Sequence, residues 1–348
     1  MKKLILSALG VLITILIWGQ ESKWPMQKSG VWRFENHLPE ISYNLRNSTL
    51  SDSDNIAFKN NVANLSNWFY QNHAMLKNPR GYDLRAIAGW TWSDYTTKTE
   101  AEYGIPASLS FLFEVFDNEG GKWTIEPPQY EFEINSIYGA IAGGYFTPES
   151  IVDDGSRYPL SKSETVSAAL AGMCSYFQVF PLKEQPCPGV NVYQIYPGKF
   201  MQKIVVFNPD RPPFWIPATV KEMAGVHMRY YELFDKLEID RMIFEQLKQE
   251  IAELSEKELN APAYYGHDSH FVLKVNGKRQ GLQIMRFNPE YWDKTLPVSA
   301  IQIMTFWNPC NTEEEMKAQQ ERAYPDFPQL FVNQINWEKT ANLIARKK

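Results

Sequence analysis

Residues 109–117 read LSFLFEVFD, and this stretch decides the fold class of the chain. Its apolar residues recur at every second position, at Leu109, Phe111, Phe113 and Val115. Because successive side chains of a strand point to opposite faces of a sheet, the alternation predicts a β-strand with one strongly apolar face. Residues 130–134, YEFEI, show the same alternation more cleanly, and residues 85–92 form a third candidate strand. Together these segments predict an antiparallel sheet with one buried and one more polar face.

Apolar runs that end in an aromatic residue followed by Asn-Pro occur three times in the second half of the chain. The runs cover residues 203–207, 282–287 and 301–307. Asn bonds readily to its own downstream backbone, and Pro cannot continue the ladder of a central strand. The pattern therefore predicts three further strands, each ending at its Asn-Pro pair.

Apolar spacings of three and four predict an amphipathic helix over residues 55–76, with Asp52 or Ser53 as its N-cap. The sequence NPRG at residues 78–81 is expected to end this helix, because Pro and Gly interrupt helical structure. Near the C-terminus, two shorter helices are expected, the last over about residues 337–346.

The longest helical pattern follows a capping-box sequence formed by Thr219 and Glu222. Its apolar stripe comprises Met223, Tyr230, Phe234, Leu237, Phe244, Leu247, Ile251 and Leu254. The stripe predicts one long or kinked helix over about residues 220–256, packed on a sheet. Use of the same stripe for oligomerisation is the alternative.

Helices mixed with alternating strands, without a regular strand-helix-strand rhythm, predict an α+β fold. We expect antiparallel sheet segments, one long packed helix and short C-terminal helices. The Pro-rich residues 210–217 form the clearest candidate for a domain boundary. They separate an N-terminal α+β region, residues 21–212, from a C-terminal α+β region, residues 213–348, with one continuous domain as the alternative.

The N-terminal residues 1–20 read MKKLILSALGVLITILIWGQ and are typical of a secretory signal peptide of bacterial type. Lys2 and Lys3 precede an apolar run of about 15 residues, which is short for a helix that spans a bilayer. An uncleaved N-terminal anchor is the alternative. We therefore expect export to the periplasm or the cell exterior, with no transmembrane span after removal of the segment.

The composition is that of a folded protein, with 44% hydrophobic residues among 348 and a formal net charge of −5. Loss of residues 1–20 removes two lysines and no acid, so the mature chain would carry −7. This acidic balance argues against nucleic-acid binding, which requires clustered Lys and Arg. In an oxidising compartment, Cys174 and Cys187 are the natural disulfide candidates, and Cys310 is the third cysteine.

Motifs whose spacing is imposed by a mechanism are absent from the sequence. It contains no G-x-S-x-G, G-x-x-x-x-G-K-[ST], H-E-x-x-H or G-x-G-x-x-G. These absences argue against the hydrolases, nucleotide enzymes, zinc proteases and dinucleotide enzymes that carry them. No cofactor is expected.

Three carboxylate-bearing segments are candidates for chemical sites. His267, Asp268 and His270 lie in the sequence GHDSH and are candidate metal ligands, although a polar loop before a strand is the simpler interpretation. Glu131 and Glu133 share one strand face at a separation that suits glycoside hydrolysis, although a solvated face is the favoured interpretation. The sequence DDGS at residues 153–156 is interpreted as a turn rather than a calcium site.

Aromatic residues form 14% of the chain, and a subset of them suits ligand binding. Trp90 and Trp92 lie on one face of a predicted strand, with Tyr95 beyond, and exposed aromatic rings stack on sugars or line protein interfaces. Ordinary core packing is the alternative. Export, aromatic excess and missing catalytic motifs together favour a non-enzymatic protein that binds a ligand or a protein partner. A secreted hydrolase, acting on glycans with carboxylates from separate segments, is the alternative.

Overall fold

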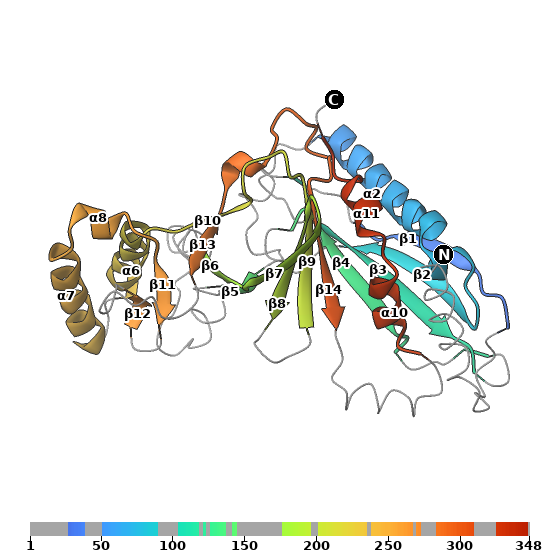
Figure 1. Ribbon diagram of the computed structural model, residues 1–348, viewed down its shortest axis with the longest axis horizontal. Coiled ribbons are helices and arrows are strands. Elements are labelled where there is room, and N and C mark those ends of the chain that lie inside the picture. Colours follow the sequence, from blue (N-terminus) through green and yellow to red (C-terminus); the bar gives the residue numbers. More distant parts are fainter. Residues whose placement is uncertain are drawn as a thin grey trace, which may run out of the picture.

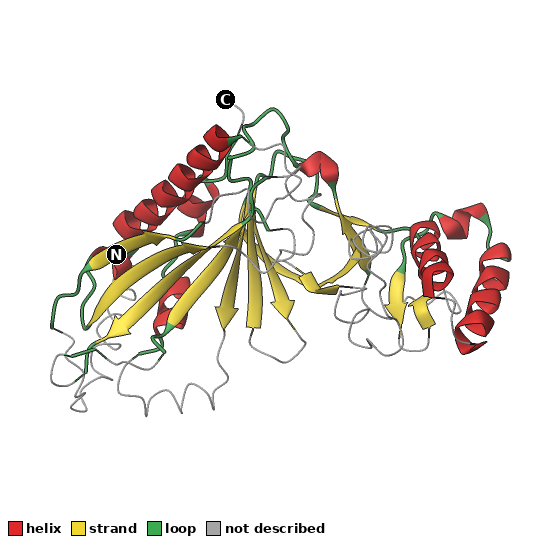
Figure 2. Ribbon diagram, turned by 180° about the vertical axis from the view of Figure 1, so that it is seen from behind, coloured by secondary structure: helices red, strands yellow, loops and turns green. Residues whose placement is uncertain are grey.

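The computed structural model confirms an α+β protein built around a large mixed sheet (Figure 1). It describes residues 27–38, 51–89, 104–117, 121–122, 126–136, 141–144, 176–195, 201–234, 238–266, 269–272, 283–309 and 325–346. Figures 1 and 2 show three parts side by side: the large sheet with its helices, a smaller sheet, and a helical part at the far end.

The large sheet has eight strands in the order β1-β2-β3-β4-β14-β9-β8-β7. Their bounds are Trp32–Asn36 (β1), Tyr82–Gly89 (β2), Ala107–Val115 (β3), Gln129–Ile134 (β4), Ile303–Pro309 (β14), Met201–Phe207 (β9), Val190–Ile195 (β8) and Leu182–Cys187 (β7). All neighbours pair antiparallel except β1 and β2, which are parallel. The strands predicted over residues 109–117 and 130–134 are therefore confirmed, as neighbours β3 and β4.

Strand β14 joins distant parts of the sequence in the middle of this sheet. It pairs with β4 on one side and with β9 on the other. Strands from residues 21–212 and 213–348 thus share one sheet. This favours the continuous-domain alternative over a domain boundary at residues 210–217. The division into two regions stays a prediction.

Two of the three strands end just before their Asn-Pro pair, and the third includes the pair. After β9 and after β13 (Ile284–Phe287), Asn208 and Asn288 accept hydrogen bonds at Oδ1 from the backbone N–H groups of Asp210 and Glu290. The third strand, β14, also ends at its pair, but it includes Asn308 and Pro309 as its last two described residues. Those two residues pair in register with the start of β9.

One face of the large sheet is covered by helices and carries the main core. Helices α2 (Asp52–Asn72), α10 (Phe327–Asn333) and α11 (Trp337–Ala341) pack there, and the short α3 (Ala74–Lys77) follows α2. Ser51 forms the capping box of α2 with Asp54, so the predicted caps Asp52 and Ser53 are wrong by one and two positions. At the C-terminus, α11 is shorter than the helix predicted over residues 337–346.

A second sheet packs against part of the opposite face. Its strands follow the order β10 (Trp215–Pro217), β13, β6 (Tyr176–Val179) and β5 (Ile141–Gly144). A mostly aromatic cluster joins the two sheets, with Val205 and Ile303 from the large sheet among its buried members. The 3-10 helix η1 (Pro289–Tyr291) contributes Tyr291 to the same cluster.

The long helix predicted over residues 220–256 is instead divided. Helices α6 (Val220–Phe234) and α7 (Glu238–Ala252) are separate and pack against each other, and the short α8 (Glu256–Leu259) follows. The predicted capping box at Thr219 and Glu222 is confirmed. A seven-residue apolar repeat does not require one continuous helix, because two shorter helices can turn the same stripe toward one core.

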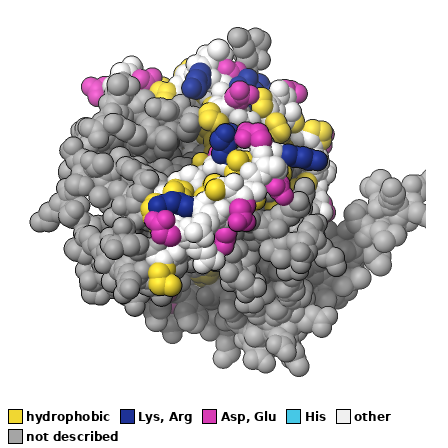
Figure 3. Space-filling model, turned by 90° about the vertical axis from the view of Figure 1, so that its left-hand side faces the viewer, with side chains coloured by type: hydrophobic (Ala, Val, Ile, Leu, Met, Phe, Trp, Pro, Cys, Tyr) yellow, Lys and Arg dark blue, Asp and Glu magenta, His cyan; other side chains and the backbone are white. Residues whose placement is uncertain are grey.

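The described members of the stripe contribute to that local core. Met223 and Leu247 are buried, and Phe244, Ile251 and Leu254 pack against the same cluster. Strands β11 (Tyr264–Gly266) and β12 (Ser269–Val272) form a two-stranded sheet beside α6. Figure 3 shows this end of the molecule, where basic and acidic side chains lie among hydrophobic ones.

No helix in the described part of the chain is long and apolar enough to cross a membrane. The predicted signal peptide, residues 1–20, lies outside the described residues.

Candidate functional site

A cavity of about 590 Å³ lies where β7, β8 and β9 meet the second sheet. Aromatic and aliphatic side chains form most of its wall, together with a few polar groups. The lining residues are Val179, Phe180, Pro181, Leu182, Gln185, Asn191, Tyr193, Phe207, Pro209, Arg211, Pro213, Phe214, Trp215, Gln283 and Met285. This size and this mixture are typical of small-molecule sites.

A chain of hydrogen-bonded polar side chains crosses the β7–β8 part of the cavity wall. The Gln185 Nε2 group donates to Asn191 Oδ1 over 2.7 Å, and Asn191 Nδ2 donates to the Tyr193 hydroxyl over 2.9 Å. Burial raises the pKa of Tyr193 to about 12, although the Asn191 hydrogen bond opposes the shift. The hydroxyl is therefore neutral at physiological pH, and its own proton is available to a ligand.

Arg211 alone carries a charge among the described residues that line the cavity. Its Nε donates to the carbonyl oxygen of Tyr291 over 2.8 Å, and its Nη2 donates to those of Glu290 and Trp292 over 2.7 and 3.1 Å. These bonds fix the guanidinium against η1. The wall therefore combines a fixed positive charge with uncharged hydrogen-bonding groups.

A second group of polar residues lies on the same face of the large sheet, farther from the cavity. In β4, Tyr130, Phe132 and Ile134 pack into the helix-covered core, so Glu131 and Glu133 point to the other face. Glu131 is exposed and accepts a hydrogen bond from the Ser110 hydroxyl over 2.7 Å. The expectation of a solvated face fits Glu131 but not Glu133.

Glu133 has a carboxylate oxygen, Oε2, that is buried without a hydrogen-bond partner. Burial raises the pKa of Glu133, and the charge of Glu131 adds to the increase. The Ser136 hydroxyl and Lys203 oppose the shift, but neither forms a hydrogen bond to Oε2. Glu133 therefore differs from Glu131, two positions away, in that its carboxylate is buried.

Lys203 lies on this face in β9, paired with Tyr193 of β8 and Trp307 of β14. Its Nζ stands 4.2 Å from the centre of the Trp307 ring. Burial lowers the pKa of Lys203 to about 8, although the negative charge of Glu133 opposes the shift. An amine in this state is partly neutral near physiological pH, unlike a surface lysine.

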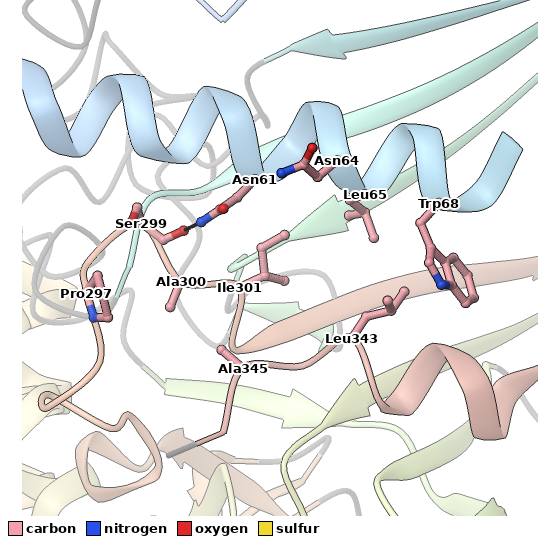
Figure 4. A pocket seen from close by; sticks show the side chains of 10 residues that line it. All are labelled: Asn61, Asn64, Leu65, Trp68, Pro297, Ser299, Ala300, Ile301, Leu343 and Ala345. Carbon is pink, nitrogen blue, oxygen red and sulfur yellow. Dashed lines mark hydrogen bonds between the residues drawn. The ribbon is translucent and has the colours of Figure 1, made fainter. Parts of the chain in front are cut away.

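A smaller groove of about 390 Å³ lies between α2 and the C-terminal segments, as Figure 4 shows. Leu65, Trp68, Ile301 and Leu343 form its apolar wall, and the Asn61 amide donates to the Ser299 carbonyl over 2.8 Å. None of its described lining residues is titratable. The groove therefore offers shape and one amide bridge but, among its described lining residues, no acid or base.

Most of the site residues predicted from the sequence lie where the structure gives no description. Trp90, Trp92, Tyr95, His267 and Asp268 are outside the described residues, as are residues 153–156. Only the backbone placement of His270, in β12, is described. In the described part of the chain, no group of three or more His, Cys, Asp or Glu residues is placed to hold a metal ion.

The predicted disulfide between Cys174 and Cys187 is not observed. Cys187 carries a free thiol, and burial and the charge of Glu338 raise its pKa. Cys174 and Cys310 lie outside the described residues.

Sequence reasoning missed Asn191, Tyr193, Lys203 and Arg211. The only local indication was the alternation of Asn191 and Tyr193 with valines in residues 190–193, which marks an ordinary strand. Comparison of the chain with protein-family models found no match, and comparisons with curated proteins and with solved structures found none either.

Proposed function

We propose that the protein is an exported, non-enzymatic binding protein that takes a small, largely apolar ligand into the cavity lined by Tyr193, Phe214 and Trp215. The observation that carries this proposal is the combination of aromatic walls with the Gln185–Asn191–Tyr193 hydrogen-bond chain. Apolar walls supply affinity by excluding water, and a few fixed polar groups select the ligand.

The chemistry of the wall favours a planar ligand with an acceptor or an anionic group. Aromatic side chains pack well against flat rings. The Tyr193 hydroxyl offers a proton, and the fixed Arg211 guanidinium contributes positive charge. An aromatic anion satisfies all three features.

The alternative, a secreted glycan hydrolase, receives no support from this cavity. Glycoside hydrolysis uses a pair of carboxyl groups on the two sides of the scissile bond. None of the described residues that line the cavity is Asp or Glu. The binding proposal therefore accounts for the cavity better than the hydrolase does.

Filling the mouth of the cavity should prevent binding of 8-anilinonaphthalene-1-sulfonate, an aromatic anion whose fluorescence rises in apolar sites. Leu182 lines the cavity and is 50% exposed, so L182W adds bulk there with little effect on stability. We expect the affinity of L182W for the dye to fall at least tenfold in a fluorescence titration.

Removal of the Tyr193 hydroxyl in Y193F should weaken binding of the dye by about fivefold, the value of one hydrogen bond.

Val31 provides the matched control for this titration. It is also 50% exposed but does not line the cavity, so V31W should bind the dye as the unmodified protein does. Equal affinity of L182W and V31W would refute the assignment of the site.

Export is tested by the mass of the protein after expression of the full chain in a bacterium. We expect the exported fraction to lack about the first 20 residues, as a cleaved signal peptide requires. The variant L12R places a charge within the apolar run and should retain the uncleaved chain in the cell. An uncleaved chain attached to membranes would show the anchor alternative to be correct.

A disulfide bond and oligomerisation are two further expectations that can be tested on the exported protein. If Cys174 and Cys187 pair in an oxidising compartment, the exported protein should be two mass units lighter before reduction, with both residues in one linked peptide pair. Oligomerisation through the stripe of Met223, Leu247 and Leu254 stays a proposal, and light scattering that shows a monomer at high concentration would contradict it.

A further inference from the structure

Lys203 is a buried amine that the binding proposal does not use. The residue is 7% exposed and does not line the cavity. Its Nζ rests against the ring of Trp307, which is 37% exposed. The amine thus lies beside an aromatic ring that solvent reaches, in a position where most proteins place an apolar side chain.

Unpartnered polar atoms lie on the neighbouring strands of the same face. Glu133 and Thr305 are directly paired across β4 and β14, and each has a buried oxygen without a hydrogen-bond partner, Oε2 and Oγ1 respectively. Buried polar atoms without partners are rare and destabilising, so they indicate a place for a small polar group. Thr305 is 1% exposed, so its unpaired hydroxyl lies in the protein interior.

We propose that Lys203 is a modification site that forms an imine with small planar aldehydes. The amine lone pair attacks the carbonyl carbon, the carbonyl π electrons move to oxygen, and the proton released from nitrogen passes to the Glu133 carboxylate. Glu133 returns this proton to the alkoxide oxygen, which gives the neutral carbinolamine. The nitrogen lone pair then forms the C=N bond as the hydroxyl group leaves, and the second N–H proton passes by way of Glu133 to that hydroxyl, which departs as water. The sum is amine plus aldehyde to imine plus water, and no oxidant or reductant takes part.

The surroundings of Lys203 explain why this lysine reacts in preference to others. Among described residues, Tyr193 of β8 and Trp307 of β14 pair directly with Lys203, and Glu133 of β4 acts on it through its charge. The pKa of Tyr193 is about 12, so its hydroxyl stays neutral up to pH 10. Burial lowers the pKa of Lys203 to about 8 despite Glu133, and a neutral amine is the nucleophilic form.

Lys248 is the matched control within the same chain. Its Nζ also stands 4.2 Å from an aromatic ring, that of Phe244. In contrast to Lys203, its side chain is 40% exposed and forms an ion pair with Glu245 over 2.6 Å. Comparison of the two lysines isolates the effect of burial from that of the aromatic contact.

The experiment incubates the full chain with 4-hydroxybenzaldehyde and sodium cyanoborohydride, which reduces the imine, and maps modified lysines by mass spectrometry between pH 6 and 10. We expect Lys203 to be modified roughly 100-fold faster than Lys248 at pH 7.5, because burial lowers the pKa of the Lys203 amine to about 8 and so raises its neutral fraction. Its rate should rise with a midpoint near pH 8. Modification of Lys203 no faster than that of Lys248 would overturn the proposal.

A second variant tests the part played by Glu133. Removing its negative charge in E133Q takes away the group that favours the ammonium, so the midpoint for Lys203 should move to lower pH. The loss of the proton acceptor should also lower the maximal rate. An unchanged midpoint and an unchanged rate in a folded E133Q would show that Glu133 takes no part in the reaction. The comparison of Lys203 with Lys248 uses the unmodified protein, so it tests the proposal even if E133Q does not fold.

Discussion

Replacing Phe69 with alanine is expected to lower the free energy of unfolding by about 3 to 5 kcal/mol. Phe69 is 1% exposed and lies at the centre of the aromatic core between α2 and the large sheet. Its ring contacts those of Phe111, Phe132, Phe306 and Phe331, at centroid distances of 5.9, 5.3, 6.2 and 6.0 Å. The cavity left by F69A adjoins four rigid rings, which cannot close it without moving strands.

Urea denaturation followed by circular dichroism measures this effect. Ile56 lies on the same helix and is 59% exposed, so I56A should change the free energy of unfolding by less than about 0.5 kcal/mol. A loss of less than 1 kcal/mol in F69A would show that Phe69 does not pack as described.

The second large effect is expected at Asn135, which follows β4. N135A should lower the free energy of unfolding by about 4 kcal/mol or more. The Asn135 Nδ2 group donates to the carbonyls of Ile105 and Ala300 over 3.1 and 2.9 Å, and its Oδ1 accepts from the Gln302 N–H over 2.9 Å. Alanine leaves these three buried backbone groups without partners.

The backbone of Asn135 adds a separate contribution. Its φ of 53° lies in the left-handed region, which costs most side chains roughly 1 kcal/mol and glycine almost nothing. N135G should therefore be about 1 kcal/mol more stable than N135A and still far less stable than the unmodified protein. Thermal unfolding of both variants separates the two contributions, and equal stability of N135G and the unmodified protein would show that the hydrogen bonds contribute nothing.

The strands and caps of this fold could be predicted because their causes are local. The period-two alternation around Phe111 and Phe132 predicted β3 and β4, and the capping box at Thr219 and Glu222 predicted the start of α6. The inclusion of Asn308 and Pro309 in β14 could not be predicted in this way. The Asn308-Pro309 pair continues its strand because β9 supplies a partner there, which no neighbouring residue in the sequence indicates.

The division of residues 220–256 into α6 and α7 illustrates the same limit. An apolar stripe indicates which side of a helix is buried, but it does not indicate whether the chain turns between two segments of that stripe. The core around Met223 and Leu247 is closed by Ala263 and Ile284, which come from other segments. The packing of α6 against α7 thus depends on contacts that only the folded chain provides.

Glu131 and Glu133 look equivalent in the sequence, yet only Glu133 has a buried oxygen without a partner. In the same way, Tyr193 and Lys203 look like ordinary alternating strand residues in the sequence. They become neighbours on one sheet face only because β8, β9 and β14 pair in the fold. The sequence by itself determined the fold class and the strand faces, because both follow from the order of polar and apolar residues along the chain. Only the tertiary structure decided where the cavity lies and which polar groups change their pKa, because burial and pairing depend on strands far apart in the sequence.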